Sequence, residues 1–257
     1  MKIRKIFPII ISFSLIILEG CSSTPELIST TENNIKIDGN VDDWGTNLKY
    51  FSDENASVGV SNDNHYFYLC LTTNELGSVM PMFAKGFVVW LENEKSDSSI
   101  GIKYPLHNIV NEARIMINPE AFRRKGRGMM LKELIDEQNE IRILNKDNFP
   151  ETVISTSDSS GLTAKIGYIN DQFVYELRVP IDKNDKDKYY LSSAPGEKIL
   201  VKFETETPER RNFGGGRGGS IMDPGGMGYP GGGYGGESGG ERMPFNPINF
   251  EVEVTLK

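Results

Sequence analysis

Acidic and amide side chains in the first quarter of the chain have the spacing of cation ligands. Asp38, Asn40 and Asp42 alternate as the first ligands of a calcium loop do. An EF-hand is excluded, because the sixth position of this pattern is aspartate instead of glycine and the twelfth is lysine instead of glutamate. Calcium held by scattered carboxylates stays open, with Asp38 and Glu176 as candidate ligands. The alternative for Glu176 is a hydrogen bond to the backbone amides of a turn.

The residue types that often act in catalysis are not spaced as they are in known catalytic motifs. His65 and His107 are far apart, and no acids or cysteines stand around them at metal-ligand spacing. No nucleophile elbow or triad signature is present. The glycine pattern at 214–219 does not lie between a strand and a helix, as a dinucleotide site requires. An enzyme is therefore the least favoured function, although acids are abundant enough for a carboxylate pair.

The N-terminus has the pattern of an export signal. Lys2, Arg4 and Lys5 precede a largely apolar run over residues 6–18, which is shorter than the about 20 residues that span a bilayer. A positive start followed by such a run is typical of a secretory signal peptide. We predict that residues 1–20 are this signal.

The signal ends at a candidate lipidation site. Residues 18–21, Leu-Glu-Gly-Cys, resemble the lipobox of bacterial lipoproteins, which implies cleavage before Cys21 and acylation of that residue. Several acyl chains anchor a protein stably, since each buried CH2 contributes about 0.8 kcal/mol. The next residues are Ser22 and Ser23, with no acidic retention signal, so we expect a cell-envelope location at the outer membrane. The polar residues 21–33 are predicted to be a flexible tether.

The net charge and the cysteine content limit which binding partners and which disulfides are expected. The net charge of −8 repels phosphate backbones, so nucleic acid is not an expected partner. With Cys21 assigned to lipid, Cys70 has no second cysteine for an intramolecular disulfide. Cys70 lies in an apolar run, so we predict a small buried side chain.

The part of the chain after the tether has the pattern of an all-β domain. Short β-type runs alternate with turn residues, and two pairs flank the turn signals at 62–64 and 170–171. The expected strands cover residues 56–61, 66–72, 86–92, 100–104, 113–117, 162–169, 172–179, 199–205 and 250–256. Many short strands at even spacing indicate an antiparallel sandwich or barrel.

Two segments interrupt the strand pattern. Residues 129–140 have apolar side chains at helical spacing, which predicts one short inserted helix outside the sheets. Residues 213–240 are glycine-rich and cannot offset their ordering entropy by burial. They are predicted to be a disordered, mobile loop before the last strand. The expected organisation is thus a single mainly β domain over residues 34–257.

Four motifs in order resemble one family. Residues 37–44, Ile-Asp-Gly-Asn-Val-Asp-Asp-Trp, resemble the opening of family 9 carbohydrate-binding modules and their DOMON-like relatives. Residues 63–71 look like the turn and aromatic strand of that family. Residues 87–92 look like its central strand, and residues 175–181 like its Glu-x-x-aliphatic-Pro strand. The resemblance covers residues 35–206 and the last strand, and it implies an antiparallel β-sandwich.

The resemblance also implies a sugar site, although the aromatic clamp of the family is not visible. The family holds sugar between two aromatic planes, one just before the central strand and one in a late loop. Residues 80–85 contain no tryptophan, and the glycine-rich segment replaces the late loop. Phe83, Tyr229 and Tyr234 are the candidate substitutes. Trp44 and Trp90 are expected to pack within the fold.

Three functions remain open, and they differ in what the structure must contain. A non-catalytic glycan-binding module requires an aromatic platform. An interaction protein that binds another envelope protein would instead expose an apolar patch. An enzyme would gather acids with shifted pKa values in a pocket.

Overall fold

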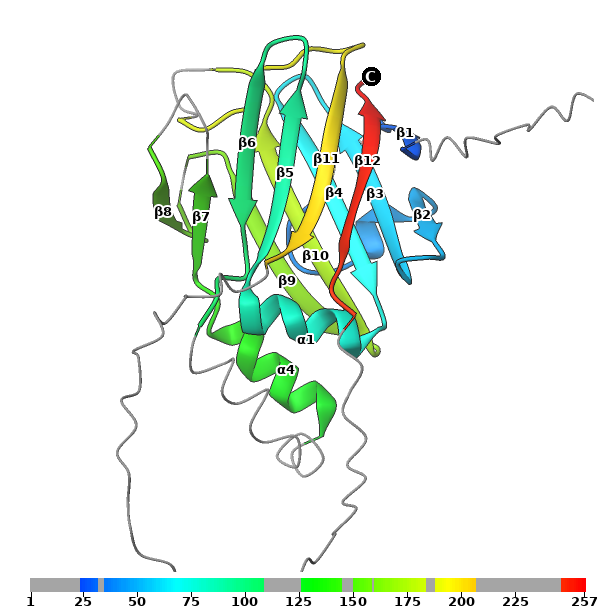
Figure 1. The fold of residues 1–257 in the computed structure, drawn as a ribbon, viewed down its shortest axis with the longest axis vertical. Helices are drawn as coiled ribbons and strands as arrows, with labels where there is room; N and C mark the ends of the chain where they lie inside the picture. Colours follow the sequence, from blue (N-terminus) through cyan, green and yellow to red (C-terminus); the bar gives the residue numbers. More distant parts are fainter. Residues whose placement is uncertain are drawn as a thin grey trace, which may run out of the picture.

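The chain folds into two β-sheets packed face to face (Figure 1). The computed structural model describes residues 24–31, 35–108, 126–144, 150–158, 160–183, 188–206 and 246–257. The mainly β sandwich predicted from the sequence is confirmed. The predicted strand at 113–117, the signal at 1–20 and the glycine-rich loop at 213–240 lie outside the described residues.

The two sheets have different sizes. In order across the larger sheet, its seven strands are β1 (Glu26–Ile28), β12 (Asn249–Thr255), β11 (Lys198–Thr205), β5 (Phe87–Asn93), β6 (Ser98–Lys103), β7 (Glu140–Leu144) and β8 (Thr152–Ser155). The smaller sheet has the order β2 (Leu48–Phe51), β3 (Ala56–Asn62), β4 (Tyr66–Thr73), β10 (Gln172–Pro180) and β9 (Thr163–Ile169). All neighbours are antiparallel except β1 and β12.

Buried apolar residues alternate with more exposed residues along the strands, and the buried ones form the core between the sheets. In β11, Ile199, Val201 and Phe203 are buried, whereas the residues between them are partly exposed. Full burial of such a side chain stabilises the fold by about 1.5–3 kcal/mol. The smaller sheet also buries its outer face, where residues 35–48 cover the central strands with a second apolar cluster. Its buried members are Trp44, Tyr68, Cys70 and Val174.

This second cluster confirms two predictions. Trp44 ends a short 3-10 helix (η1, Asp42–Trp44) and is 1% exposed, so it packs as expected. Cys70 is fully buried, and burial raises the pKa of its thiol well above the ordinary value. A thiol in such surroundings is inert.

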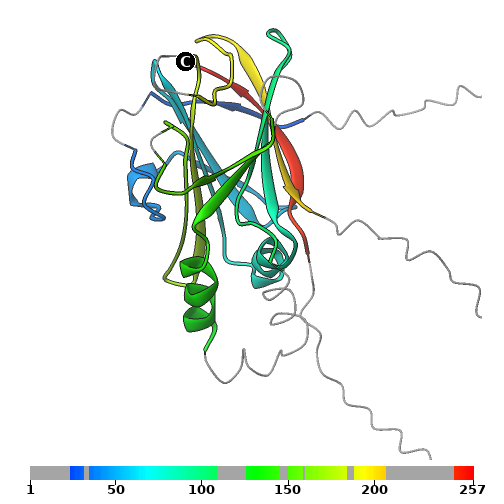
Figure 2. The same cartoon turned by 90° about the vertical axis from the view of Figure 1, so that its left-hand side faces the viewer.

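Two helices cover one end of the sandwich among the described residues (Figures 1 and 2). The predicted helix is α4 (Arg127–Asp136); its last four predicted residues instead lead into β7. Helix α4 buries Leu131 and Leu134 in the core, so it closes the sandwich end. None of the described helices is long and apolar enough to cross a membrane.

Helix α1 (Leu76–Lys85) was not predicted, because Pro81 lies inside it and proline breaks helices. Pro81 cannot donate the usual hydrogen bond to the carbonyl of Gly77. That carbonyl instead accepts a bond from the backbone N–H of Asn246, at 3.0 Å. A segment far along the chain thus replaces the missing donor.

The predicted tether over 21–33 needs correction. Residues 26–28 form β1, which pairs in parallel with β12, and Thr30 continues as a bridge to β3 of the other sheet. Ser29, Asn62 and the C-terminal Lys257 then form a hydrogen-bonded cluster. The boundary at residue 34 is therefore wrong. Residues 24–31 form a strap across one edge of the sandwich and belong to the domain.

Candidate functional site

Phe83, the candidate aromatic before the central strand, is not a sugar platform. It lies in α1, is fully buried, and packs edge-on against Phe173 with ring centroids 6.2 Å apart. The helix turns this side chain into the space between the sheets, so neither face of the ring is available to a ligand. The prediction for Phe83 is wrong. Tyr229, Tyr234 and Cys21 lie outside the described residues and stay predictions.

Glu176 accepts hydrogen bonds from a turn, which was the alternative to cation binding. Its Oε2 accepts the backbone N–H groups of Asp38 and Gly39 at 2.9 and 2.6 Å, and its Oε1 accepts the indole N–H of Trp44 at 2.7 Å. Burial raises the pKa of Glu176, and the three N–H donors oppose that rise. With both carboxylate oxygens engaged, the calcium hypothesis loses Glu176 as a ligand.

Asp38 also has a structural role, since its Oδ1 accepts the backbone N–H of Asn40 at 2.9 Å. In the part of the chain that the structure describes, no three His, Cys, Asp or Glu side chains gather as a metal site would require. Asp38 and Glu176 therefore tie the turn at 38–39 to β10.

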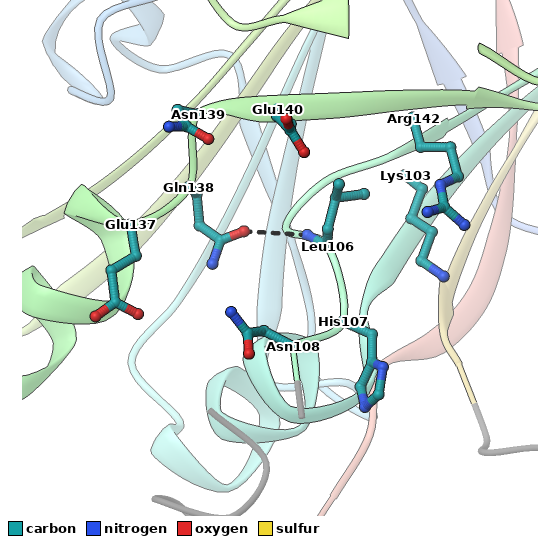
Figure 3. A pocket seen from close by; sticks show the side chains of 9 residues that line it. All are labelled: Lys103, Leu106, His107, Asn108, Glu137, Gln138, Asn139, Glu140 and Arg142. Atoms are coloured by element: carbon teal, nitrogen blue, oxygen red, sulfur yellow. Dashed lines mark hydrogen bonds between the residues drawn. The ribbon is translucent and has the colours of Figure 1, made fainter. Parts of the chain in front are cut away.

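A polar pocket of about 420 Å³ opens where β6 and β7 meet the helical end of the sandwich (Figure 3). Three segments line it, namely the end of β6 with residues 106–108, the link from α4 to β7, and β7 itself. The lining residues are Lys103, Leu106, His107, Asn108, Glu137, Gln138, Asn139, Glu140 and Arg142. All but Leu106 carry a polar or charged side chain.

Strand pairing places the two positively charged side chains of this pocket opposite each other. Lys103 on β6 and Arg142 on β7 are register partners, and Figure 3 shows their side chains next to each other. Like charges directly opposite on one face are destabilising. Each is flanked by a carboxylate: the Nζ of Lys103 lies 2.5 Å from Glu206, and the Nη1 of Arg142 lies 3.2 Å from Glu151.

Two further details bear on ligand binding. The side chain of Gln138 is held in place, since its Oε1 accepts the backbone N–H of Leu106 at 3.1 Å. The Nε of Arg142 is buried and has no hydrogen-bond partner among the described residues. Leaving a buried donor unpaired costs about 1–3 kcal/mol, so the conformation of the Arg142 side chain is held at a cost in free energy.

The sequence contains one signal for this pocket, which the expected helix over residues 129–140 did not reveal. Residues 140–144, Glu-Ile-Arg-Ile-Leu, alternate as a strand with one wet face does. The helix was predicted to extend to Glu140, so the alternating residues from 140 onward were not assigned to a strand. The other two segments reach the pocket through tertiary packing, which a local pattern does not contain.

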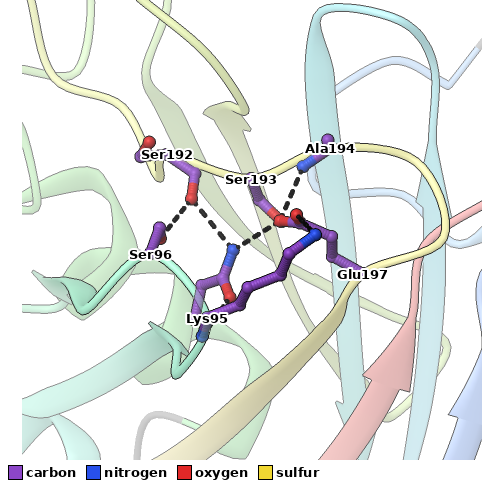
Figure 4. Close-up of polar contacts among 7 residues, drawn as sticks. Lys95, Ser96, Ser192, Ser193, Ala194 and Glu197 are labelled. Atoms are coloured by element: carbon purple, nitrogen blue, oxygen red, sulfur yellow. Dashed lines mark hydrogen bonds and ion pairs between the residues drawn. The ribbon is translucent and has the colours of Figure 1, made fainter.

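A second polar cluster, at the opposite end of the larger sheet, is structural (Figure 4). Glu197 accepts hydrogen bonds from the Nζ of Lys95 at 2.7 Å, the Nδ2 of Asn93 at 2.8 Å and the backbone N–H of Ala194 at 3.1 Å. Asn93 also donates to the carbonyl of Ser192 at 2.9 Å. These bonds join the β5–β6 turn to the loop before β11.

The stabilising contribution of Glu197 to this junction is expected to decrease at low pH. The hydrogen bonds from Lys95 and Asn93 lower the pKa of Glu197 to about 2. A depressed pKa stabilises the fold above the ordinary value of about 4.3, and that contribution is lost as pH falls through it toward 2. We expect Glu197→Gln to be less stable than wild type at pH 7, with the difference shrinking below pH 4 in urea unfolding. A difference that stays constant with pH would contradict this assignment.

Comparison with known proteins adds little to this geometry. No family model and no curated protein matches the chain. Among solved structures, it is similar to a carbohydrate binding module family 9 protein from Caldicellulosiruptor kristjanssonii, in complex with glucose and with cellotriose. The two matches have 14% and 15% identity, cover 69% of this chain and 76% and 74% of those chains, and have TM-scores of 0.33 and 0.34.

Proposed function

We propose that this chain is a non-catalytic lipoprotein of the cell envelope that binds glycan in the pocket between β6 and β7. The observation that carries the proposal is the lining of this pocket, in which eight of the nine residues carry a polar or charged side chain.

The mixture of lining groups favours a hydroxyl-rich ligand over a simple ion. Lys103 and Arg142 donate hydrogen bonds, Glu137 and Glu140 accept them, and the side-chain amides can do both. The formal charges of these four ionic residues cancel. Hydroxyl groups also donate and accept, so a neutral polyol can pair with both kinds of group. A few well-placed polar groups fix the orientation of a ligand in such a pocket.

We expect Arg142→Ala to weaken glycan binding about tenfold, which corresponds to loss of about 1.4 kcal/mol. The mature chain, held in lauryldimethylamine oxide because that detergent contains no sugar, is first applied to a glycan array. The affinity for the bound glycan is then measured by calorimetry. Lys183→Ala, which removes an exposed cation after β10, should bind as wild type. Equal binding by Arg142→Ala and wild type would rule out the pocket.

The strap at residues 24–31 supports a defined orientation on the membrane. Only two residues, Ser22 and Ser23, separate Cys21 from Thr24, and the three steps along the chain reach at most about 11 Å. The strap lies at the β1 edge of the larger sheet, whereas the pocket lies between its fourth and fifth neighbours, β6 and β7. At about 4.8 Å per strand, the pocket stands about 19–24 Å from that edge. An anchor at Cys21 would therefore hold the β1 edge close to the bilayer and the pocket away from it.

Lipid anchoring is tested separately. We expect Cys21→Ser to move the chain from the membrane fraction to the soluble fraction after cell lysis, because the acylated residue is lost. Ser22→Ala keeps the cysteine and should stay in the membrane fraction. If Cys21→Ser also stays with the membrane, another part of the chain anchors it.

The protein-interaction alternative has weaker support. The large hydrophobic residues exposed among the described segments are Ile28, Tyr50, Met129, Val153 and Ile169. They lie on five different elements, and singly exposed apolar residues are normal on a protein surface. They therefore do not call for a protein partner.

A further inference from the structure

The charged side chains of the pocket between β6 and β7 are not evenly distributed around it. Lys103 and Arg142 are register partners on the two strands, and Figure 3 shows their charged ends on one side of the pocket. Glu137 follows α4 and Glu140 begins β7. The formal charges of these four residues cancel, but the pocket has a positive end and an acidic end.

Strand geometry brings the two cations together on one face of the sheet. Their neighbours Ile102 and Ile143 are also register partners and are fully buried in the core. Because successive side chains of a strand point to opposite faces, Lys103 and Arg142 both point to the outer face. Side chains directly opposite each other have Cβ atoms about 4.5–5.5 Å apart. One small anionic group can therefore contact both cations.

The surroundings of Lys103 hold its ammonium group at the positive end. Its side chain is 11% exposed, and its Nζ lies 2.5 Å from Glu206. Gly86, the residue between α1 and β5, leaves the space for this pair. A Cβ atom added there would stand 2.8 Å from the Cε of Lys103 and 3.2 Å from the Oε2 of Glu206. A charge with so little water around it interacts more strongly with a ligand than a fully solvated charge does.

Both cations keep donors that a ligand can use. Lys103 donates to Glu206, and the Nη1 of Arg142 lies 3.2 Å from Glu151. Neither of these carboxylates lines the pocket. An ammonium has three N–H groups and a guanidinium has five, so one carboxylate does not engage them all. Like charges directly opposite each other also destabilise a strand pair, and a bound anion relieves that repulsion.

From this geometry we propose that the glycan bound here is acidic, and that the carboxylate of a uronic acid unit lies between Lys103 and Arg142. The planar fork of arginine matches a carboxylate, and hydrogen bonds between ionised groups are about twice as strong as neutral ones. The hydroxyls of the same unit donate toward Glu140 at the other end. That acid also repels a second carboxylate, which selects one orientation of the unit. This inference rests on the proposed glycan binding.

The test compares uronic acid sugars with their methyl esters, which keep the ring and the hydroxyls but carry no charge. Glucuronic, galacturonic and mannuronic acids, as monosaccharides and as trisaccharides, are titrated against the full mature chain in lauryldimethylamine oxide. For the sugar that binds, we expect the acid to bind wild type about tenfold more tightly than its ester. The preference should shrink when the ionic strength rises from about 0.01 M to about 1 M, because the Debye length falls from about 30 Å to about 3 Å.

Variants locate the carboxylate. Arg142→Gln and Lys103→Gln remove a charge but keep a hydrogen-bond donor, so the ratio of acid to ester affinity should fall toward one while the ester still binds. Lys165→Gln makes the same change at an exposed position of β9, on the other sheet, and should keep the preference of wild type. Urea unfolding checks that each variant is folded under the binding conditions.

The possible failures are distinct. If wild type binds the acid and the ester equally well, or if both pocket variants keep the preference, no carboxylate lies between Lys103 and Arg142. The proposed glycan function survives that result. If folded wild type binds none of these sugars and the glycan array is also blank, the proposed glycan function is wrong as well.

Discussion

Replacing Glu176 by glutamine is expected to lower the free energy of unfolding by about 2–3 kcal/mol. One carboxylate accepts three N–H donors, two from the turn at 38–39 and one from Trp44. Glutamine has a single carbonyl oxygen, so its NH2 group must face either the indole or the two turn amides. Each donor left unpaired in this buried place costs about 1–3 kcal/mol. Glu176→Ala should cost more, since it removes every acceptor and leaves a cavity.

The measurement is urea unfolding at pH 8, above the ordinary pKa of glutamate, followed by the emission of Trp44. Glu204→Gln is the matched control: the same change at an exposed position of β11, expected to stay within about 0.5 kcal/mol of wild type. If Glu176→Gln were as stable as Glu204→Gln, the turn amides and the indole would have adequate alternative partners. Glu176 would then not be the link between the N-terminal segment and β10.

Local patterns predicted the parts of this fold that local interactions determine. The β3–β4 and β9–β10 hairpins are confirmed because each has a turn signal between two β-type runs. The last strand is confirmed because its wet and buried residues alternate. Trp44 was assigned to packing from the family resemblance, in which its position is a core residue, and it is buried in the second apolar cluster.

The errors arise where a distant segment decides the local structure. Helix α1 tolerates Pro81 because Asn246 bonds the carbonyl that the proline leaves free, and this helix then buries Phe83. Strand β1 exists because β12, more than two hundred residues later, pairs with it. The candidate pocket has the same origin, since it combines three segments that lie apart in the sequence.

A close backbone approach between Gly39 and Gly167 leads to a second large effect. An added Cβ at Gly167 of β9 would stand 1.9 Å from the carbonyl oxygen of Gly39. Gly39 cannot easily move away, because its backbone has a φ of +82° and its N–H is bound to Glu176. Gly167→Ala must therefore displace the turn that Glu176 holds. We expect it to lower the free energy of unfolding by about 3 kcal/mol, at the upper end of the usual cost of overpacking.

Gly128→Ala in α4 is the matched control, since its added Cβ would meet only the ring of Tyr168, at an ordinary 3.7 Å. Alanine is also the better helix former there, so no loss of stability is expected. The double variant of Gly167→Ala and Glu176→Gln distinguishes the causes. Because both changes release the same turn, their combined cost should be smaller than the sum of the single costs. Strict additivity would mean that Gly167 acts through β9 itself, and the 38–39 turn would then not be the element that both residues hold in place.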